Sequence, residues 1–92
     1  MKFTDRDIEE YWLGGPAPRR VPPDVRKRLV RKLQMLEAAA ELQDLRIPPS
    51  HHLEKLQGDR AGTYSIRVTD QWRLVFDGDG GEANNAAFID YH

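Results

Sequence analysis

Residues 64–76 of the chain, YSIRVTDQWRLVF, decide the fold. Two runs within this stretch alternate large apolar residues with polar or smaller ones. The alternation predicts half-buried strands, because successive side chains of a strand point to opposite faces. The intervening Thr-Asp-Gln at 69–71 favours a turn, so we predict a β-hairpin with one face in the core. Arg67 then lies on the other face, where Arg73 can join it. The predicted core face carries Tyr64, Ile66 and Val68.

The chain before the hairpin has helical patterns. Thr4 and Asp7 predict a capping box that starts a first helix, which Gly14-Gly15-Pro16 ends. Residues 14–23 form a Gly- and Pro-rich connector that cannot continue a helix. A second helix is predicted from Pro23-Asp24, because apolar residues recur there at three- and four-residue steps. That face consists of Val25, Leu29, Leu33, Leu36 and Ala40, and a short further turn is expected around Leu42 and Leu45.

From residue 50 onward, helical periodicity gives way to short alternating runs. We predict strands at about 53–57, 63–69, 71–77 and 83–91, with turns at Gly58-Asp59 and at 78–81. Helices followed by strands are typical of an α+β domain. We therefore expect a single domain over residues 1–92, with two N-terminal helices packed on one face of a C-terminal antiparallel sheet.

Composition and charge narrow the class of protein. The net charge is −1, cysteine is absent, and no apolar run has the length of a membrane-spanning helix or signal peptide. These features favour a soluble cytoplasmic protein that does not insert into a membrane. Basic residues nevertheless concentrate between 19 and 32, where they form either a solvated helix face or a surface that meets phosphates. They are Arg19, Arg20, Arg26, Lys27, Arg28, Arg31 and Lys32.

Several separated motifs give the chain a resemblance to a known family. They include RIPPSHH, the block HLEKLQGDRAGTYSIRVTDQWRLVF and the terminal IDYH. Their order and spacing resemble the HigB-type branch of the RelE/ParE superfamily of bacterial toxins, over nearly the whole chain. Such proteins are small α+β toxins of type II toxin–antitoxin systems.

The resemblance implies a function and a set of partners. It implies an endoribonuclease that cuts messenger RNA in the ribosomal A site, without a metal or another cofactor. The RNA 2′-hydroxyl would attack the adjacent phosphate and leave a cyclic phosphate and a 5′-hydroxyl. The implied partners are the ribosome with its mRNA and a HigA-like antitoxin with a helix-turn-helix domain. Operator DNA would be contacted only through the antitoxin complex.

The resemblance also carries candidate site residues. Arg73 matches the sheet arginine that would stabilise the phosphate, although an exposed strand residue paired with Asp70 or Asp90 is the structural alternative. His92 would act as acid or base near neutral pH, although a frayed terminus is the alternative. The remaining catalytic candidates are Tyr91, Asp90 and His52, the last preferred over His51 by position. Candidate RNA contacts are Lys55, Gln57, Arg60 and Arg67.

One position departs from the family pattern. Gln57 occupies the place before the Gly-Asp-Arg turn where relatives commonly carry lysine. Glutamine can donate a hydrogen bond but brings no charge to offset the transition state, and Lys55 two residues earlier could partly substitute. Two hypotheses therefore stay open at this point. The chain is either an active ribonuclease or a binding member that acts through antitoxin, ribosome or gyrase contacts.

Overall fold

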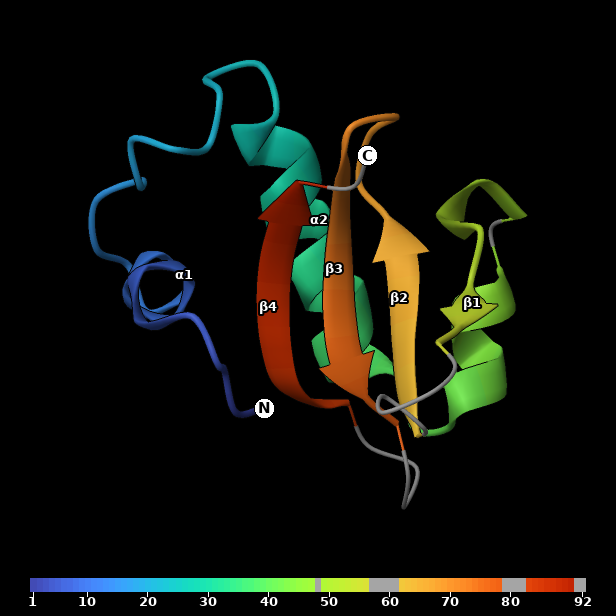
Figure 1. Cartoon of the computed structure of the whole chain (residues 1–92). Coiled ribbons are helices and arrows are strands. Elements are labelled where there is room, and N and C mark those ends of the chain that lie inside the picture. Colours follow the sequence, from blue (N-terminus) through green and yellow to red (C-terminus); the bar gives the residue numbers. More distant parts are fainter. Residues whose placement is uncertain (48, 57–61, 79–82, 91–92) are drawn as a thin grey trace.

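The computed structural model describes residues 1–47, 49–56, 62–78 and 83–90. Two α-helices come first, α1 (Arg6–Trp12) and α2 (Arg26–Ala38), and two 3-10 helices follow, η1 (Leu42–Arg46) and η2 (Pro49–His51). The strands form one antiparallel sheet of order β1-β2-β3-β4 (Figure 1). Its strands are β1 (Glu54–Lys55), β2 (Thr63–Arg67), β3 (Trp72–Asp77) and β4 (Asn84–Asp90). The predicted α+β class is confirmed. No helix in these described ranges is long and apolar enough to cross a membrane.

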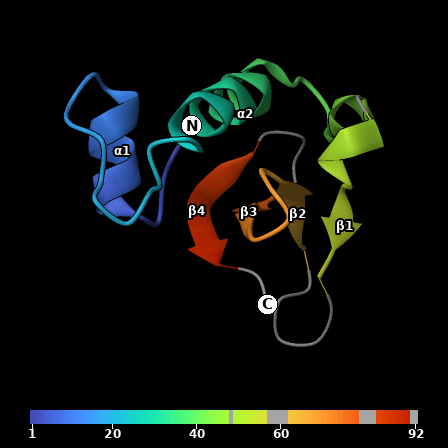
Figure 2. The same ribbon diagram turned by 90° about the horizontal axis from the view of Figure 1, so that it is seen from above.

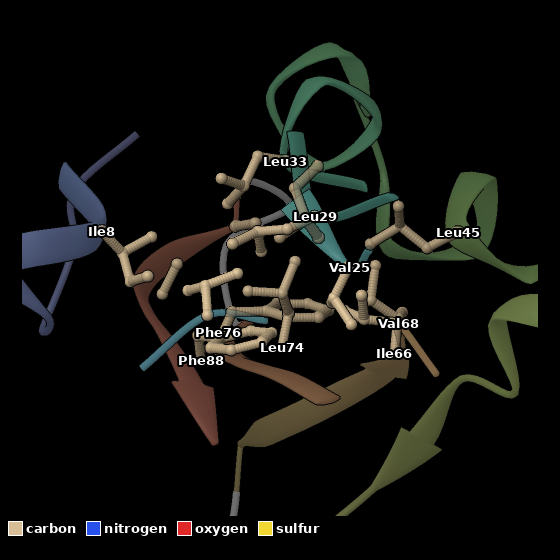
Figure 3. Packing of buried hydrophobic residues seen from close by; sticks show 14 residues of the cluster. Ile8, Val25, Leu29, Leu33, Leu45, Ile66, Val68, Leu74, Phe76 and Phe88 are labelled. Atoms are coloured by element: carbon tan, nitrogen blue, oxygen red, sulfur yellow. The ribbon is translucent and has the colours of Figure 1, made fainter. Parts of the chain in front are cut away.

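The two α-helices take different positions against the sheet. Helix α2 crosses one face, and α1 lies beside the edge strand β4 (Figures 1 and 2). Buried side chains from α1, α2 and the strands meet between these layers (Figure 3). The predicted periodicity of α2 is confirmed, since its buried residues are Leu29, Leu33 and Leu36. They pack in one cluster with Ile8, Ile66, Leu74, Phe76 and Phe88.

The central hairpin has the predicted faces. Ile66 is fully buried and lies opposite Leu74, whereas Arg67 lies opposite Arg73. Because directly opposite residues share a face, the two arginines project from the face that α2 does not cover. Thr69 stabilises the turn, because its hydroxyl accepts hydrogen bonds from the backbone N–H groups of Gln71 and Trp72.

The predicted start of α1 is wrong. Asp5 precedes the helix, and no side-chain capping hydrogen bond is present there. The hydroxyl of Thr4 instead donates to the carbonyl of Asn85 over 3.1 Å, and its backbone N–H donates to the carbonyl of Ala86 over 2.8 Å. Thr4 therefore extends the hydrogen bonding along the outer edge of β4 and is not available as a cap.

Other element boundaries differ by a few residues from the prediction. Helix α2 begins at Arg26, after Val25 as its capping residue, and ends at Ala38. Ala40 is exposed and lies outside the helix, because the chain becomes extended at Ala39. The expected turn around Leu42 and Leu45 is confirmed as η1. Strand β1 is shorter than predicted, and the predicted turn at 58–59 lies outside the described residues.

One arginine of the basic run has a structural role. Arg20 Nε lies 2.7 Å from Asp7 Oδ2, and its Nη2 lies 2.7 Å from Asp5 Oδ2. Its Nη1 donates to the carbonyl of Phe88 over 2.7 Å. The hydrogen bond from Arg20 lowers the pKa of the Asp7 carboxyl below its ordinary value. Arg20 thus ties the connector to α1 and β4, while the basic residues of α2 lie on a separate element.

His51 is buried beneath α2, with 1% of its surface exposed. Its Nδ1 lies 3.1 Å from the carbonyl oxygen of Leu45, and its Nε2 lies 3.1 Å from the sulfur of Met35. Burial lowers the pKa of His51, and the nearby charge of Lys32 lowers it further, against the opposing effect of the Leu45 carbonyl. The imidazole is therefore packed in the fold in its neutral form.

We expect His51 to make the free energy of unfolding depend on pH. Since its folded pKa lies below the value of about 6.5 in an unfolded chain, its stabilising contribution is complete above that pH. It is lost as the pH falls below about 6.5 toward the folded pKa, by at most about 1.4 kcal/mol per pH unit. Urea unfolding between pH 7.5 and 5.5 should show a flatter pH dependence for His51→Gln. The exposed His52→Gln control should keep the wild-type dependence, and equal slopes for wild type and His51→Gln would contradict this account.

Candidate functional site

Arg73 forms the centre of the candidate site, on the face of β3 that α2 does not cover. Its Nε donates to Ser65 Oγ over 2.9 Å, and its Nη2 donates to the backbone carbonyls of Ser65 and His52. Only 6% of Arg73 is exposed, so the alternative of an exposed strand residue is wrong. A planar guanidinium held by several acceptors has one defined orientation. The sheet therefore presents a fixed positive charge at this point.

Glu54 brings a carboxylate to the same guanidinium. It lies opposite Ser65 in the pairing of β1 with β2, which places its side chain on the face of Arg73. Glu54 Oε1 is 3.7 Å from Arg73 Nη1, and the carboxylate side chain is half exposed. Sequence analysis did not select this residue. Successive strand residues point to opposite faces, so either Glu54 or Lys55 had to share the face of Arg73. Only the register in which β1 pairs with β2 shows that it is Glu54.

Arg67 provides a second guanidinium on this face. It is the cross-strand neighbour of Arg73, and its Nη2 is paired with the carboxylate of Asp70 in the turn. Like charges placed opposite one another on a sheet repel. Here Glu54 offsets Arg73 and Asp70 offsets Arg67. A site with two arginines and exposed carboxylates can bind an anionic group and can also accept a proton from a hydroxyl beside that group.

His52 contacts Arg73 through its backbone, whereas Lys55 points away from the face of Arg73. The backbone of His52 has a left-handed φ of 45°, and its carbonyl contacts Arg73 while its side chain is exposed. Lys55 lies opposite Tyr64, so it projects from the other side of β1 than Glu54. Both side chains line a hollow of about 620 Å³. Its other lining residues are Leu42, Arg46, Pro49, Leu53 and Tyr64.

The C-terminal candidates are only partly described. Asp90 ends β4 opposite Trp72 and accepts a hydrogen bond of 3.2 Å from the Gln71 side chain. The carboxylate of Asp90 is thus at the end of the sheet nearest the turn at 69–71. Four candidates lie outside the described residues, and their roles stay predictions. They are Gln57, Arg60, Tyr91 and His92.

Two solved structures share the architecture of this chain. The YoeB dimer structure from Staphylococcus aureus covers 99% of this chain, which in turn covers 93% of that chain, with a TM-score of 0.53 and 23% identity. A YoeB/ParE toxin from Agrobacterium tumefaciens covers 100% and 99%, with a TM-score of 0.50 and 22% identity. At these identities the likeness concerns the fold alone, and the fold is that of the RelE/ParE-type toxins.

Sequence comparison gives the particular family. The model of the HigB-like toxin, described as the RelE-like toxin of type II toxin–antitoxin system HigB, matches residues 1–92. Toxin HigB-1 of Vibrio cholerae is 38% identical over 92 residues, 100% of this chain and 96% of that protein. Endoribonuclease HigB of Proteus vulgaris is 35% identical over 72 residues, covering 78% and 77%. The chain belongs to the HigB-like toxin family, and the resemblance inferred from its motifs is confirmed. Membership of a type II system implies an antitoxin partner.

Proposed function

We propose that this toxin is a ribosome-dependent endoribonuclease that cuts mRNA in the A site and needs no metal. Family membership and the name of the Proteus vulgaris relative support ribonuclease activity. The observation that carries the proposal is the oriented guanidinium of Arg73, beside Glu54 and Arg67 on one sheet face. A HigA-like antitoxin with a helix-turn-helix domain is the proposed partner, and through it operator DNA. Since the proposed substrate of the toxin is mRNA on the ribosome, we expect the toxin to act in the cytoplasm.

The two arginines supply the charge that the reaction needs. When the 2′-oxygen attacks phosphorus, negative charge builds on the phosphorane oxygens before the bond to the 5′-oxygen breaks. Arg73 is already held by Ser65 and His52, so its guanidinium need not reorganise as this charge develops. Arg67 adds a second positive charge at the neighbouring cross-strand position.

The two proton transfers need a base and an acid. The carboxylate of Glu54, 3.7 Å from Arg73, is placed to accept the proton of the attacking 2′-hydroxyl. His92 is the proposed acid that returns a proton to the 5′-oxygen as it leaves, with Tyr91 and Asp90 orienting the phosphate and the imidazole. The O2′–P bond forms and the P–O5′ bond breaks, which leaves a cyclic phosphate and a 5′-hydroxyl.

Primer extension on mRNA in a reconstituted translation reaction tests this proposal. Wild-type protein should create new 5′ ends at A-site codons, and only when ribosomes are present. Loss of one acid or base costs about 10²–10⁴-fold in rate, so both Glu54→Gln and His92→Ala should cut the yield of new ends accordingly. Glu10→Gln is the matched control, because Glu10 is also a partly exposed carboxylate facing an arginine, on α1. It should cleave like the wild type.

Two results would count against the proposal. Full cleavage by Glu54→Gln and by His92→Ala would remove both residues from the chemistry. A folded wild-type protein that cosediments with ribosomes but creates no new ends would instead be a binding protein. In that case Gln57→Lys is the variant that asks whether the missing lysine accounts for the lost activity.

A further inference from the structure

A second group of cations lies in a hollow between α2 and the end of β2. The cationic hollow, as we call it, has a volume of about 340 Å³. Helix α2 contributes Arg28, Arg31 and Lys32, and β2 contributes Arg67. The helix residues are spaced so that all three lie on one side of it, because three- and four-residue steps return to the same face. The remaining lining residues are Val68 and Thr69.

Three of the four cations in this hollow have no acidic partner within the described part of the chain. In the described part of the chain, Arg67 is paired with Asp70, but no carboxylate lies within ion-pair distance of Arg28, Arg31 or Lys32. Burial lowers the pKa of Lys32, and the charges of Arg28 and Arg31 lower it further. Like charges brought together in this way repel, and an anion bound among them would relieve the repulsion.

The hollow is connected to the candidate site through Arg67. Arg67 is one of the residues that line the hollow, and it is also the cross-strand neighbour of Arg73. A polyanion that reaches Arg73 can therefore continue past Arg67, at the end of β2, toward the cations of α2. A chain with one phosphate per residue would place one phosphate at Arg73 and a later one in the hollow.

The surroundings favour RNA over an acidic protein segment. An adjoining hollow shares Arg28, Arg67 and Thr69 with the first one and is also lined by Asp24 and Asp70. An acidic segment crossing both hollows would bring its carboxylates against these two. An RNA strand carries its charge on the phosphates alone, and its bases offer N–H donors that carboxylates can accept.

We propose that the cationic hollow is an RNA-backbone site, which holds a phosphate of the strand some distance from the cleaved bond. This inference rests on the proposed function, because it takes the strand bound at Arg73 to be RNA. Arg28, Arg31 and Lys32 act in binding, and Arg67 belongs to both sites.

Binding can be measured without cleavage. The probe is a fluorescein-labelled single-stranded RNA with 2′-O-methyl groups, which lacks the attacking hydroxyl, and anisotropy is followed from 50 to 200 mM salt. For the double variant Arg28→Gln, Arg31→Gln we expect about tenfold weaker binding and a log–log salt slope shallower by about 1.4, or about 0.7 per lost phosphate contact. The control Arg6→Gln, Lys27→Gln removes the same net charge from exposed positions. It should bind like the wild type.

Each other outcome overturns the inference. Equal losses in the double variant and its control would mean only a general charge effect, and wild-type protein that does not bind the probe at 50 mM salt would exclude a site. If the double variant binds RNA normally but loses binding to a labelled polyglutamate peptide, the occupant is an acidic protein segment. Thermal unfolding of both variants confirms that they are folded.

The cleavage assay separates failure of this inference from failure of the proposed function. The double variant should still cleave mRNA in the reconstituted reaction, but should need about tenfold more protein to do so. Wild-type protein that binds RNA through the hollow yet never cleaves mRNA would refute the proposed ribonuclease and leave the binding site in place.

Discussion

Arg73→Gln is expected to lower A-site cleavage by about 10²–10³-fold, the effect of removing one preorganised donor to a developing oxyanion. Glutamine can still donate to Ser65 Oγ but has no positive charge to stabilise the phosphorane. Arg73→Lys keeps the charge and loses the planar fork that contacts Ser65 and His52 together. Because lysine is a point charge without this geometry, we expect an intermediate loss for Arg73→Lys.

The same substitution also affects folding, and the two effects must be separated. Ser65 is fully buried, so an unpartnered hydroxyl or carbonyl there costs about 1–3 kcal/mol of unfolding free energy. Urea unfolding of each variant establishes the fraction folded, and cleavage rates are compared per folded molecule. Arg6→Gln, at an arginine whose side chain is 90% exposed, is the control for general charge loss. A folded Arg73→Gln protein that cleaves at the wild-type rate would exclude Arg73 from the site.

Phe88→Ala should have the largest effect on stability, at about 3–5 kcal/mol. The ring is 1% exposed and stacks on Trp72 with centroids 4.5 Å apart and planes inclined by 7°. The Arg20 guanidinium lies 5.5 Å from the ring centroid. Alanine would leave a cavity between these groups, and the loss is a large part of the about 5–15 kcal/mol that stabilises a typical domain.

Urea unfolding measures this effect. It is followed by far-ultraviolet circular dichroism and not by fluorescence, because loss of the ring also alters the fluorescence of Trp72. Phe88→Leu fills most of the space and should lose less than about 1.5 kcal/mol. Leu13→Ala is the matched control, because Leu13 is a large apolar residue that is 76% exposed. It should change stability by less than about 0.5 kcal/mol. Ordinary substitutions destabilise by about 0.5–3 kcal/mol. A loss below about 1 kcal/mol for Phe88→Ala would lie at the low end of that range and would contradict the packing described for β4.

Local patterns predicted the elements well where neighbouring residues decide the outcome. Alternation placed Ile66 in the core and Arg67 on the other face, and the short turn at 69–71 set the register that pairs Arg67 with Arg73. Helical spacing identified the buried face of α2. Thr4 was misjudged, because its hydrogen bonds go to β4 at the other end of the chain, which no local pattern reveals.

The candidate site was predictable only in part. Arg73 followed from its strand position and the family resemblance, but its partners did not. The carbonyl of His52 reaches it because that residue adopts a left-handed backbone, and Glu54 reaches it because β1 pairs with β2 in one particular register. A shift of that register by one residue would place Lys55 on the face of Arg73 instead.

The amino-acid sequence by itself determined the class of fold, the core faces of α2 and the hairpin, and the presence of two arginines on one sheet face. These follow from side-chain periodicity, which depends on residues a few positions apart. Tertiary structure alone decided that Arg20 braces the core, that Glu54 faces Arg73, and that three cations of α2 meet Arg67 in one hollow. Those arrangements join distant segments, and they exist only because burial of one shared core fixes how helix and strands are placed against each other.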